Sequence, residues 1–238
     1  MYVPMRRYER IRTTAFNVTQ TTCNATVWWP TPPCCQRPCP PYANADILVI
    51  LDSSSSIGRF NWNKVKEFVI DMFENIVVGE NSLRVSVFRF NEEIDSDSQI
   101  LFKDYLEDKD GLIRAIRSIP YNGNGTKTGK ALAYANDVML TTENGNRPNS
   151  QDTIFIITDG RSQDGVRDEA VALHERGAQV VVIGVQPGIN AELDENQLTE
   201  IAGNADNVLI VEGGFDSLGE LIGEGLGTRL CPQPCEDF

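Results

Sequence analysis

The sequence predicts an open, doubly wound α/β domain, in which a mostly parallel sheet carries helices on both faces. Several short runs are apolar without a break, which is typical of strands buried on both faces. The segments between these runs have apolar residues at helical spacing, and the two kinds of segment alternate along the chain. Strands that alternate with helices in this way form a mostly parallel sheet between two layers of helices.

The first half of the domain opens with the apolar run Ala45–Leu51, which predicts a buried strand. From Asn61 to Ile76, apolar residues recur at steps of three and one and predict an amphipathic helix. Leu83–Phe90 alternates as a second strand, and we expect Gln99–Phe102 beside it as a short antiparallel edge strand. Two further helices are expected over Lys109–Ile119 and Gly129–Leu140.

The second half begins with Thr153–Thr158 (TIFIIT), another strand that is apolar enough to be buried on both faces. The alternation continues with the helix Val166–Arg176, the strand Gln179–Val185, the helix Leu193–Ala202, the strand Asn207–Val211 and the helix Phe215–Leu226. The last helix contains several glycines, each of which destabilises a helix by roughly 0.5–1 kcal/mol relative to alanine. We therefore expect it to be the least stable helix of the domain.

The chain divides into three parts by composition. Residues 1–42 are rich in Pro, Thr and Cys and predict an extended tail, because prolines exclude helices and discourage strands. Residues 43–230 form the predicted domain, and residues 231–238 are a short tail that contains cysteine. No apolar run reaches eighteen residues, so we expect no membrane insertion. The arginine-rich N-terminus has no apolar stretch behind it, so we do not expect it to be an intact signal peptide.

Cysteines occur only in the two tails and are candidates for disulfides that tie the ends of the domain together: Cys23, Cys34, Cys35, Cys39, Cys231 and Cys235. Disulfides of this kind form in oxidising compartments, and Cys39–Cys231 is the pair we expect. A zinc site made of four thiolates is the alternative. Two glycosylation sequons, at Asn17 and Asn24, agree with a secreted protein and are the candidate sites for sugar.

Charge and motifs exclude two classes of function. The formal net charge of −13 opposes binding to phosphate backbones, so nucleic acid is not an expected partner. The single histidine, His174, lies in a predicted helix away from the carboxyl ends of the strands. The sequence also has neither a Gly-x-Ser-x-Gly elbow nor a phosphate-binding loop with a Gly-Lys-Ser/Thr ending. We therefore predict that the protein is not an enzyme.

Oxygen-bearing side chains follow the first predicted strand. Asp52, Ser54 and Ser56 are two residues apart, and in an extended loop this spacing directs all three side chains to one side. Alone, a serine run after a strand is more often an ordinary loop with a helix cap. In an open α/β sheet, however, ligands bind at the carboxyl ends of the strands, which is where this loop lies.

Two further segments strengthen the case for a metal site. The glycine-rich stretch Gly123–Gly129 opens a predicted helix and contains Thr126, and Asp159 follows the strand Thr153–Thr158. The three loops supply two carboxylates and three hydroxyls, with no thiolate or imidazole. Such hard oxygen donors suit Mg²⁺, which keeps open positions for water or a ligand; Mn²⁺ and Ca²⁺ are the alternatives.

On these residues the sequence resembles the von Willebrand factor A domain family, which includes the inserted domains of integrins and matrix proteins. The resemblance covers residues 43–230. The metal-ion-dependent adhesion site of that family is Asp-x-Ser-x-Ser, then a threonine, then an aspartate at the end of a strand. The matching segments are Asp52-Ser53-Ser54-Ser55-Ser56, Gly125-Thr126-Lys127-Thr128-Gly129 and Ile157-Thr158-Asp159-Gly160.

The resemblance implies a role for each residue of the site. Ser54, Ser56 and, in the ligand-ready state, Thr126 would coordinate the ion directly, whereas Asp52 and Asp159 would act directly or through water. A glutamate or aspartate of a protein partner would fill the remaining position. We therefore expect an extracellular adhesion module, secreted or in the matrix. The alternative is a structural matrix or assembly protein, part of a larger assembly, in which the metal only stabilises the loops.

A third sequon lies inside the expected metal loop, at Asn124-Gly125-Thr126. A glycan on Asn124 would stand beside the open coordination position and block a protein partner. We therefore expect Asn124 to stay free of sugar.

Overall fold

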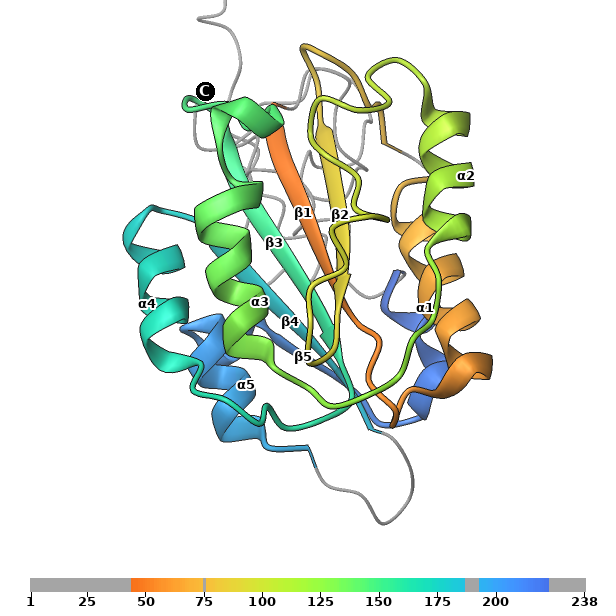
Figure 1. The fold of residues 1–238 in the computed structure, drawn as a ribbon, viewed down its shortest axis with the longest axis vertical. Helices are drawn as coiled ribbons and strands as arrows, with labels where there is room; N and C mark the ends of the chain where they lie inside the picture. The colour runs from red at the N-terminus through yellow and green to blue at the C-terminus, as the bar shows by residue number, and fades with distance from the viewer. Residues whose placement is uncertain (1–43, 75, 187–192, 223–238) are drawn as a thin grey trace, which may run out of the picture.

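A computed structural model describes residues 44–74, 76–186 and 193–222, and within these ranges the chain forms a five-stranded sheet flanked by helices (Figure 1). All neighbouring strands are parallel, and their order across the sheet is β2-β1-β3-β4-β5. This confirms the predicted α/β fold with a central parallel sheet. Its strands are β1 (Ala45–Asp52), β2 (Arg84–Phe90), β3 (Gln151–Thr158), β4 (Gln179–Val185) and β5 (Val208–Val211).

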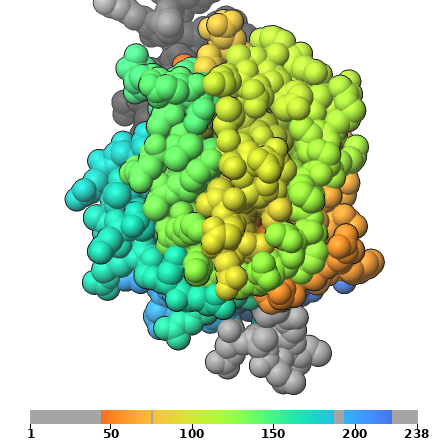
Figure 2. All heavy atoms as spheres, viewed as in Figure 1, coloured from red at the N-terminus to blue at the C-terminus, as the bar shows by residue number. Residues whose placement is uncertain are grey.

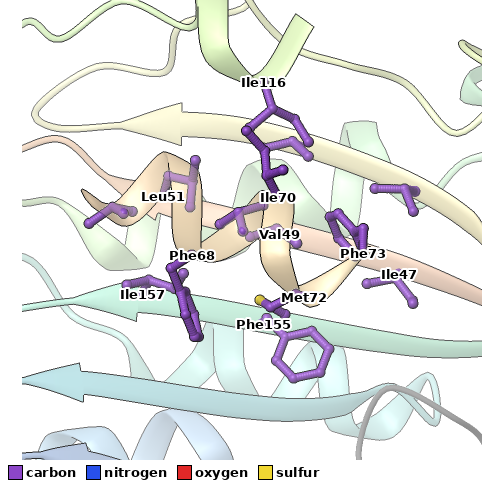
Figure 3. Packing of buried hydrophobic residues seen from close by; sticks show 14 of the residues in the cluster. Ile47, Val49, Leu51, Phe68, Ile70, Met72, Phe73, Ile116, Phe155 and Ile157 are labelled. Atoms are coloured by element: carbon purple, nitrogen blue, oxygen red, sulfur yellow. The ribbon is translucent and has the colours of Figure 1, made fainter. Parts of the chain in front are cut away.

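Helices cover both faces of the sheet because successive strand residues point to opposite sides. Ile47 and Val49 of β1 pack with helices α1 and α2 on one face, whereas Leu48 and Ile50 pack with α3, α4 and α5 on the other. Figure 3 shows the first of these layers, with Phe68 and Phe73 lying over the strands. The helices are α1 (Gly58–Met72), α2 (Lys109–Ser118), α3 (Thr128–Tyr134), α4 (Arg167–Glu175) and α5 (Glu195–Ala202).

The predicted antiparallel edge strand is not present as a strand. Ile100 makes a single antiparallel bridge to Val87, with hydrogen bonds of 2.8 and 3.0 Å, and the chain turns away after it. The segment between β2 and α2, yellow in Figure 2, instead packs beside α3, where Tyr134 donates to Gln99 over 2.7 Å. This packing covers the exposed side of β2, so the edge is protected without a continuous strand.

Two predicted helices differ in form. Over the predicted helix 129–140, α3 gives way to a π-helical turn, Ala135–Met139, in which the Leu140 amide donates to the Ala135 carbonyl. The last predicted helix begins as a 3₁₀ turn, Gly214–Ser217, before Leu218 packs into the core. The part of that helix after residue 222 lies outside the described residues, as do all six cysteines, Asn17 and Asn24. Within the described part, no helix combines the length and apolar character needed to cross a membrane.

A buried ion pair closes the end of the sheet opposite the carboxyl ends of the strands. Asp46, at the start of β1, is fully buried. Its carboxylate accepts hydrogen bonds from the backbone and guanidinium of Arg147 at 2.6–2.8 Å, and Arg147 also donates to the carbonyls of Ala45 and Ser82. Arg147 thus connects the segment before β3 to the first strand and to the turn before β2.

Replacing Arg147 tests how much this ion pair stabilises the fold. Arg147→Met should lower the free energy of unfolding by about 2–4 kcal/mol, because it leaves the Asp46 carboxylate buried without its cation. Urea denaturation followed by circular dichroism measures the difference. Arg114→Met is the control: Arg114 is exposed and 4.0 Å from Asp108, so its loss should be below about 0.5 kcal/mol. Equal effects from the two variants would contradict the assigned role.

Candidate metal centre

The candidate centre lies where the strand order reverses, at the carboxyl ends of β1 and β3. These two strands are neighbours in the sheet, with Leu51 paired to Ile157, so Asp52 and Asp159 emerge side by side although they are 107 positions apart in sequence. The hydroxyl of Thr158 donates to Oδ2 of Asp52 over 2.7 Å and holds that carboxylate in place. The reversal point is the usual ligand position in such sheets.

Serine hydroxyls connect the two aspartates. The backbone amide of Ser54 donates to Oδ1 of Asp52 over 2.8 Å, and the Ser54 and Ser56 hydroxyl oxygens are 3.0 Å apart. Ser56 then donates to Oδ1 of Asp159 over 2.7 Å. The spacing by two in the sequence therefore brings the oxygens to one side of the loop, as predicted.

Thr126 reaches the same place from the loop that leads into α3. The Cα of Gly160 faces two hydroxyls: a Cβ added there would lie 3.9 Å from Ser56 Oγ and 4.0 Å from Thr126 Oγ1. Thr126 itself is buried, and its amide and carbonyl both bond to Gln163 in the loop after β3. All five predicted residues thus converge on one site.

Burial destabilises the charged form of both carboxylates. Asp52 and Asp159 are only 0 and 2% exposed. Burial raises the pKa of Asp52, and burial together with the nearby Asp52 charge raises the pKa of Asp159 to about 6. Oδ2 of Asp159 is buried without a hydrogen-bond partner in the described part of the chain. An unsatisfied buried anion is unstable unless a cation compensates it, so the residues fit a positively charged ligand.

The donor set determines which cation fits. Among the described residues, no group of three or more His, Cys, Asp or Glu side chains is placed to hold a metal. A site here would therefore combine two carboxylates with neutral hydroxyls. These are hard oxygen donors suited to a hard divalent ion, and they leave it electrophilic toward a further anion.

Asn91 is a supporting residue that the sequence analysis missed. It follows β2 directly and is 2% exposed. Its side-chain amide donates to the Gly123 carbonyl, and its backbone carbonyl accepts from the Lys127 amide over 2.9 Å. These two bonds bracket Thr126 and fix its loop. Its position directly after a buried parallel strand could have identified it, by the same rule that identified Asp52 and Asp159.

Two other contacts hold the serine loop. Ser55 and Asn124 exchange hydrogen bonds of 2.8 and 2.9 Å, and Tyr121 donates to the Ser54 carbonyl over 3.1 Å. Asn124 is exposed and has a φ of 78°, a conformation that asparagine adopts more readily than most residues. On the other side, Arg89 donates to the Ser53 hydroxyl over 3.2 Å. These hydrogen bonds connect the loops around the centre to each other.

His174 is not part of the candidate centre. It is on α4, and its Nε2 is 3.0 Å from the Ile201 carbonyl of α5. That contact packs two helices on one face of the sheet, and it places no imidazole beside the aspartates or serines.

Comparison with known proteins shows relatives in the extracellular matrix. The chain is 33% identical over 187 residues to the collagen alpha-6(VI) chain of Mus musculus, which covers 79% of this chain and 8% of that one. It is 30% identical over 191 residues to matrilin-4 of Homo sapiens, covering 78% and 29%. The chain thus spans less than a third of these relatives. Because these relatives are extracellular matrix proteins, the predicted extracellular location is confirmed.

Solved structures show the same fold. Proximal thread matrix protein 1 from the mussel byssus, in its second crystal form, has a TM-score of 0.70 at 24% identity, covering 79% of this chain and 48% of that chain. Another structure of that protein, with a zinc-occupied MIDAS motif, has a TM-score of 0.69 at 25% identity, with the same coverage. A domain of this fold can therefore hold a divalent metal.

A match to a family model identifies the family of this chain. The family model of the von Willebrand factor type A domain matches residues 46–224, which include the whole described sheet except Ala45 and all five residues of the candidate centre. The chain belongs to the von Willebrand factor type A domain family.

Proposed function

We propose that this chain binds a divalent cation, Mg²⁺ above all, and uses it to recognise a carboxylate on a protein partner in the extracellular matrix. Asp52, Ser54, Ser56, Thr126 and Asp159 would hold the ion. When bound, the ion would supply a positive charge that attracts a glutamate or aspartate of the partner. The chain's own residues would hold the ion in place and set the shape of the site that receives the partner's carboxylate.

The observation that carries this proposal is the buried Oδ2 of Asp159, which has no hydrogen-bond partner in the described part of the chain, while Oδ1 of the same carboxylate accepts from Ser56. A purely structural loop cluster would pair such an oxygen with an amide or a hydroxyl, because an unmade hydrogen bond to a charged group destabilises by more than about 1–3 kcal/mol. The relative with a zinc-occupied motif supports a cation at the equivalent place. A binding role without catalysis agrees with the position of His174 and with relatives that are matrix proteins.

Selection from a peptide library tests the function without knowing the partner. Phage that display random twelve-residue peptides are selected on the folded protein in Mg²⁺ and eluted with EDTA. We expect enrichment of peptides with one fixed Glu or Asp, and loss of binding when that residue becomes Gln or Asn. Thr126→Ala should weaken peptide binding while the protein stays folded by circular dichroism, because that hydroxyl would coordinate the ion in the ligand-ready state.

The opposite outcome identifies the structural alternative. If peptides bind equally well in Mg²⁺ and EDTA, or if none is enriched while Mg²⁺ still raises the melting temperature, the ion only stabilises the loops.

Asp159→Asn separates the charge of this residue from its shape. Mg²⁺ should raise the melting temperature of the wild type but not of the variant, because ligand binding stabilises only a protein that retains the site. In the folded state Asp159 holds its proton more tightly than when unfolded. Its contribution to stability therefore falls as the pH rises from about 4 to about 6, and the full penalty applies at pH 7.5. In EDTA at pH 7.5, the variant should equal the wild type in stability or exceed it by up to about 2 kcal/mol.

Differential scanning calorimetry with and without Mg²⁺ measures both effects. A variant that keeps the full Mg²⁺-dependent rise in melting temperature would place the ion elsewhere.

Asn91→Ala tests the residue that fixes the threonine loop. The variant loses the side-chain bond to the Gly123 carbonyl, so Mg²⁺ affinity measured by isothermal titration calorimetry should fall about tenfold, as for other residues that orient metal ligands. Asn63→Ala, an exposed site on α1, is the matched control and should leave the affinity unchanged. A lower melting temperature with unchanged Mg²⁺ affinity would show that Asn91 only stabilises the fold.

A further inference from the structure

An exposed aromatic residue lies next to the candidate metal centre. Phe60 is in the first turn of α1, four residues after Ser56, and its side chain is 75% exposed. Among the described residues it is the most exposed large apolar side chain; Val77, Val171 and Tyr105 follow at 49, 48 and 37%. The buried side of α1 is formed by other residues, such as Trp62 and Val65, so core packing does not account for Phe60.

Arg59 precedes Phe60 in the chain and contacts Tyr121, which bonds the serine loop of the centre. Its guanidinium is 5.8 Å from the centroid of the Tyr121 ring, and the hydroxyl of that ring donates to the Ser54 carbonyl. Arg59 is exposed and has no ion-pair partner within the described ranges. The side of the centre formed by α1 therefore carries an unneutralised cation, in a chain whose net charge is −13.

Lys64 completes the surroundings of Phe60 but is not a second free cation. Its ammonium lies 4.4 Å from the centroid of the Phe60 ring and 2.6 Å from a carboxylate oxygen of Asp216. Lys64 therefore covers part of the Phe60 ring, and the rest of the ring stays exposed to a partner.

We propose that Arg59, Phe60 and Tyr121, the rim patch, determine which acidic protein segments bind at the metal. The occupant is a partner segment with a large apolar side chain near its metal-binding carboxylate, and this side chain packs on Phe60. A second acidic side chain of the same segment pairs with Arg59. This inference rests on the proposed function, because the metal-bound carboxylate sets the register that places both side chains on the rim patch.

The charges favour this occupant. Most of a chain with a net charge of −13 repels an acidic segment. The metal and the unpaired Arg59 would offset this repulsion, so an acidic segment binds best where it contacts both. Aromatic and arginine side chains are also the types that contribute most to protein–protein binding energy when a partner buries them. Tyr121 of the rim patch bonds the Ser54 carbonyl, and Phe60 is four residues from Ser56, so a short segment bound at the metal is expected to reach the patch.

The test uses a peptide obtained by the Mg²⁺-dependent selection described above, labelled for fluorescence anisotropy. Phe60→Ala should weaken its binding about tenfold, and Phe60→Leu should restore most of the loss. Arg59→Ala should weaken it about threefold at low salt, and this loss should shrink as NaCl rises, because exposed ion pairs are screened. Val171→Ala on α4 and Arg114→Ala on α2, both exposed and on other helices, are the matched controls.

A double-mutant cycle assigns the contact. Phe60→Ala and replacement of the peptide's apolar residue by alanine should each weaken binding, and the two losses together should be no larger than either alone. In contrast, Asp159→Ala should abolish binding of every peptide.

Three outcomes would overturn the inference. If the wild type selects no peptide in Mg²⁺, the proposed function fails and the rim patch loses its role with it. If Mg²⁺-dependent peptides bind Phe60→Ala and Arg59→Ala within twofold of the wild type, only the inference fails. If sedimentation velocity shows a wild-type dimer that Phe60→Ala dissociates while peptide affinity is unchanged, the patch joins two copies of this chain instead.

Discussion

The pairing of β1 with β3 is the constraint on which the rest of the molecule depends. It brings Asp52 and Asp159 to the same edge of the sheet, and the Thr158 hydroxyl bonds one carboxylate directly. The same pairing is fixed at the other end, where Arg147 binds Asp46 and reaches toward β2. Two apolar layers cover these strands on both faces, so neither can shift in register without exposing its core residues.

Stability and function make opposite demands at the two ends of these strands. At the Asp46 end, the buried charge is fully paired and hydrogen-bonded, which makes it part of the scaffold. At the Asp159 end, one carboxylate oxygen has no partner in the described part of the chain. The paired end stabilises the strands that carry the unsatisfied carboxylate oxygen at their other end. This difference distinguishes a candidate site from an ordinary buried aspartate.

The loops around the candidate centre form a connected shell. Ser55 bonds to Asn124, Asn91 bonds to both sides of the Thr126 loop, and Gln163 connects that loop to the segment after β3. Such connections keep the oxygens of three separate loops within reach of one ion. They also imply that a shift in one of these loops would move the others, since hydrogen bonds connect all three.

The sequence by itself determined the strands, most of the helices and the three loops with candidate ligands, because apolar periodicity and motif spacing are local properties of the chain. It did not predict that the expected edge strand is a single bridge at Ile100, or that α3 ends in a π-helical turn. Nor did it reveal Asn91, Arg147 or the exposure of Phe60. Each of these depends on contacts, or on their absence, between segments that are distant in sequence. Only the tertiary structure decides which groups burial leaves satisfied, unsatisfied or exposed.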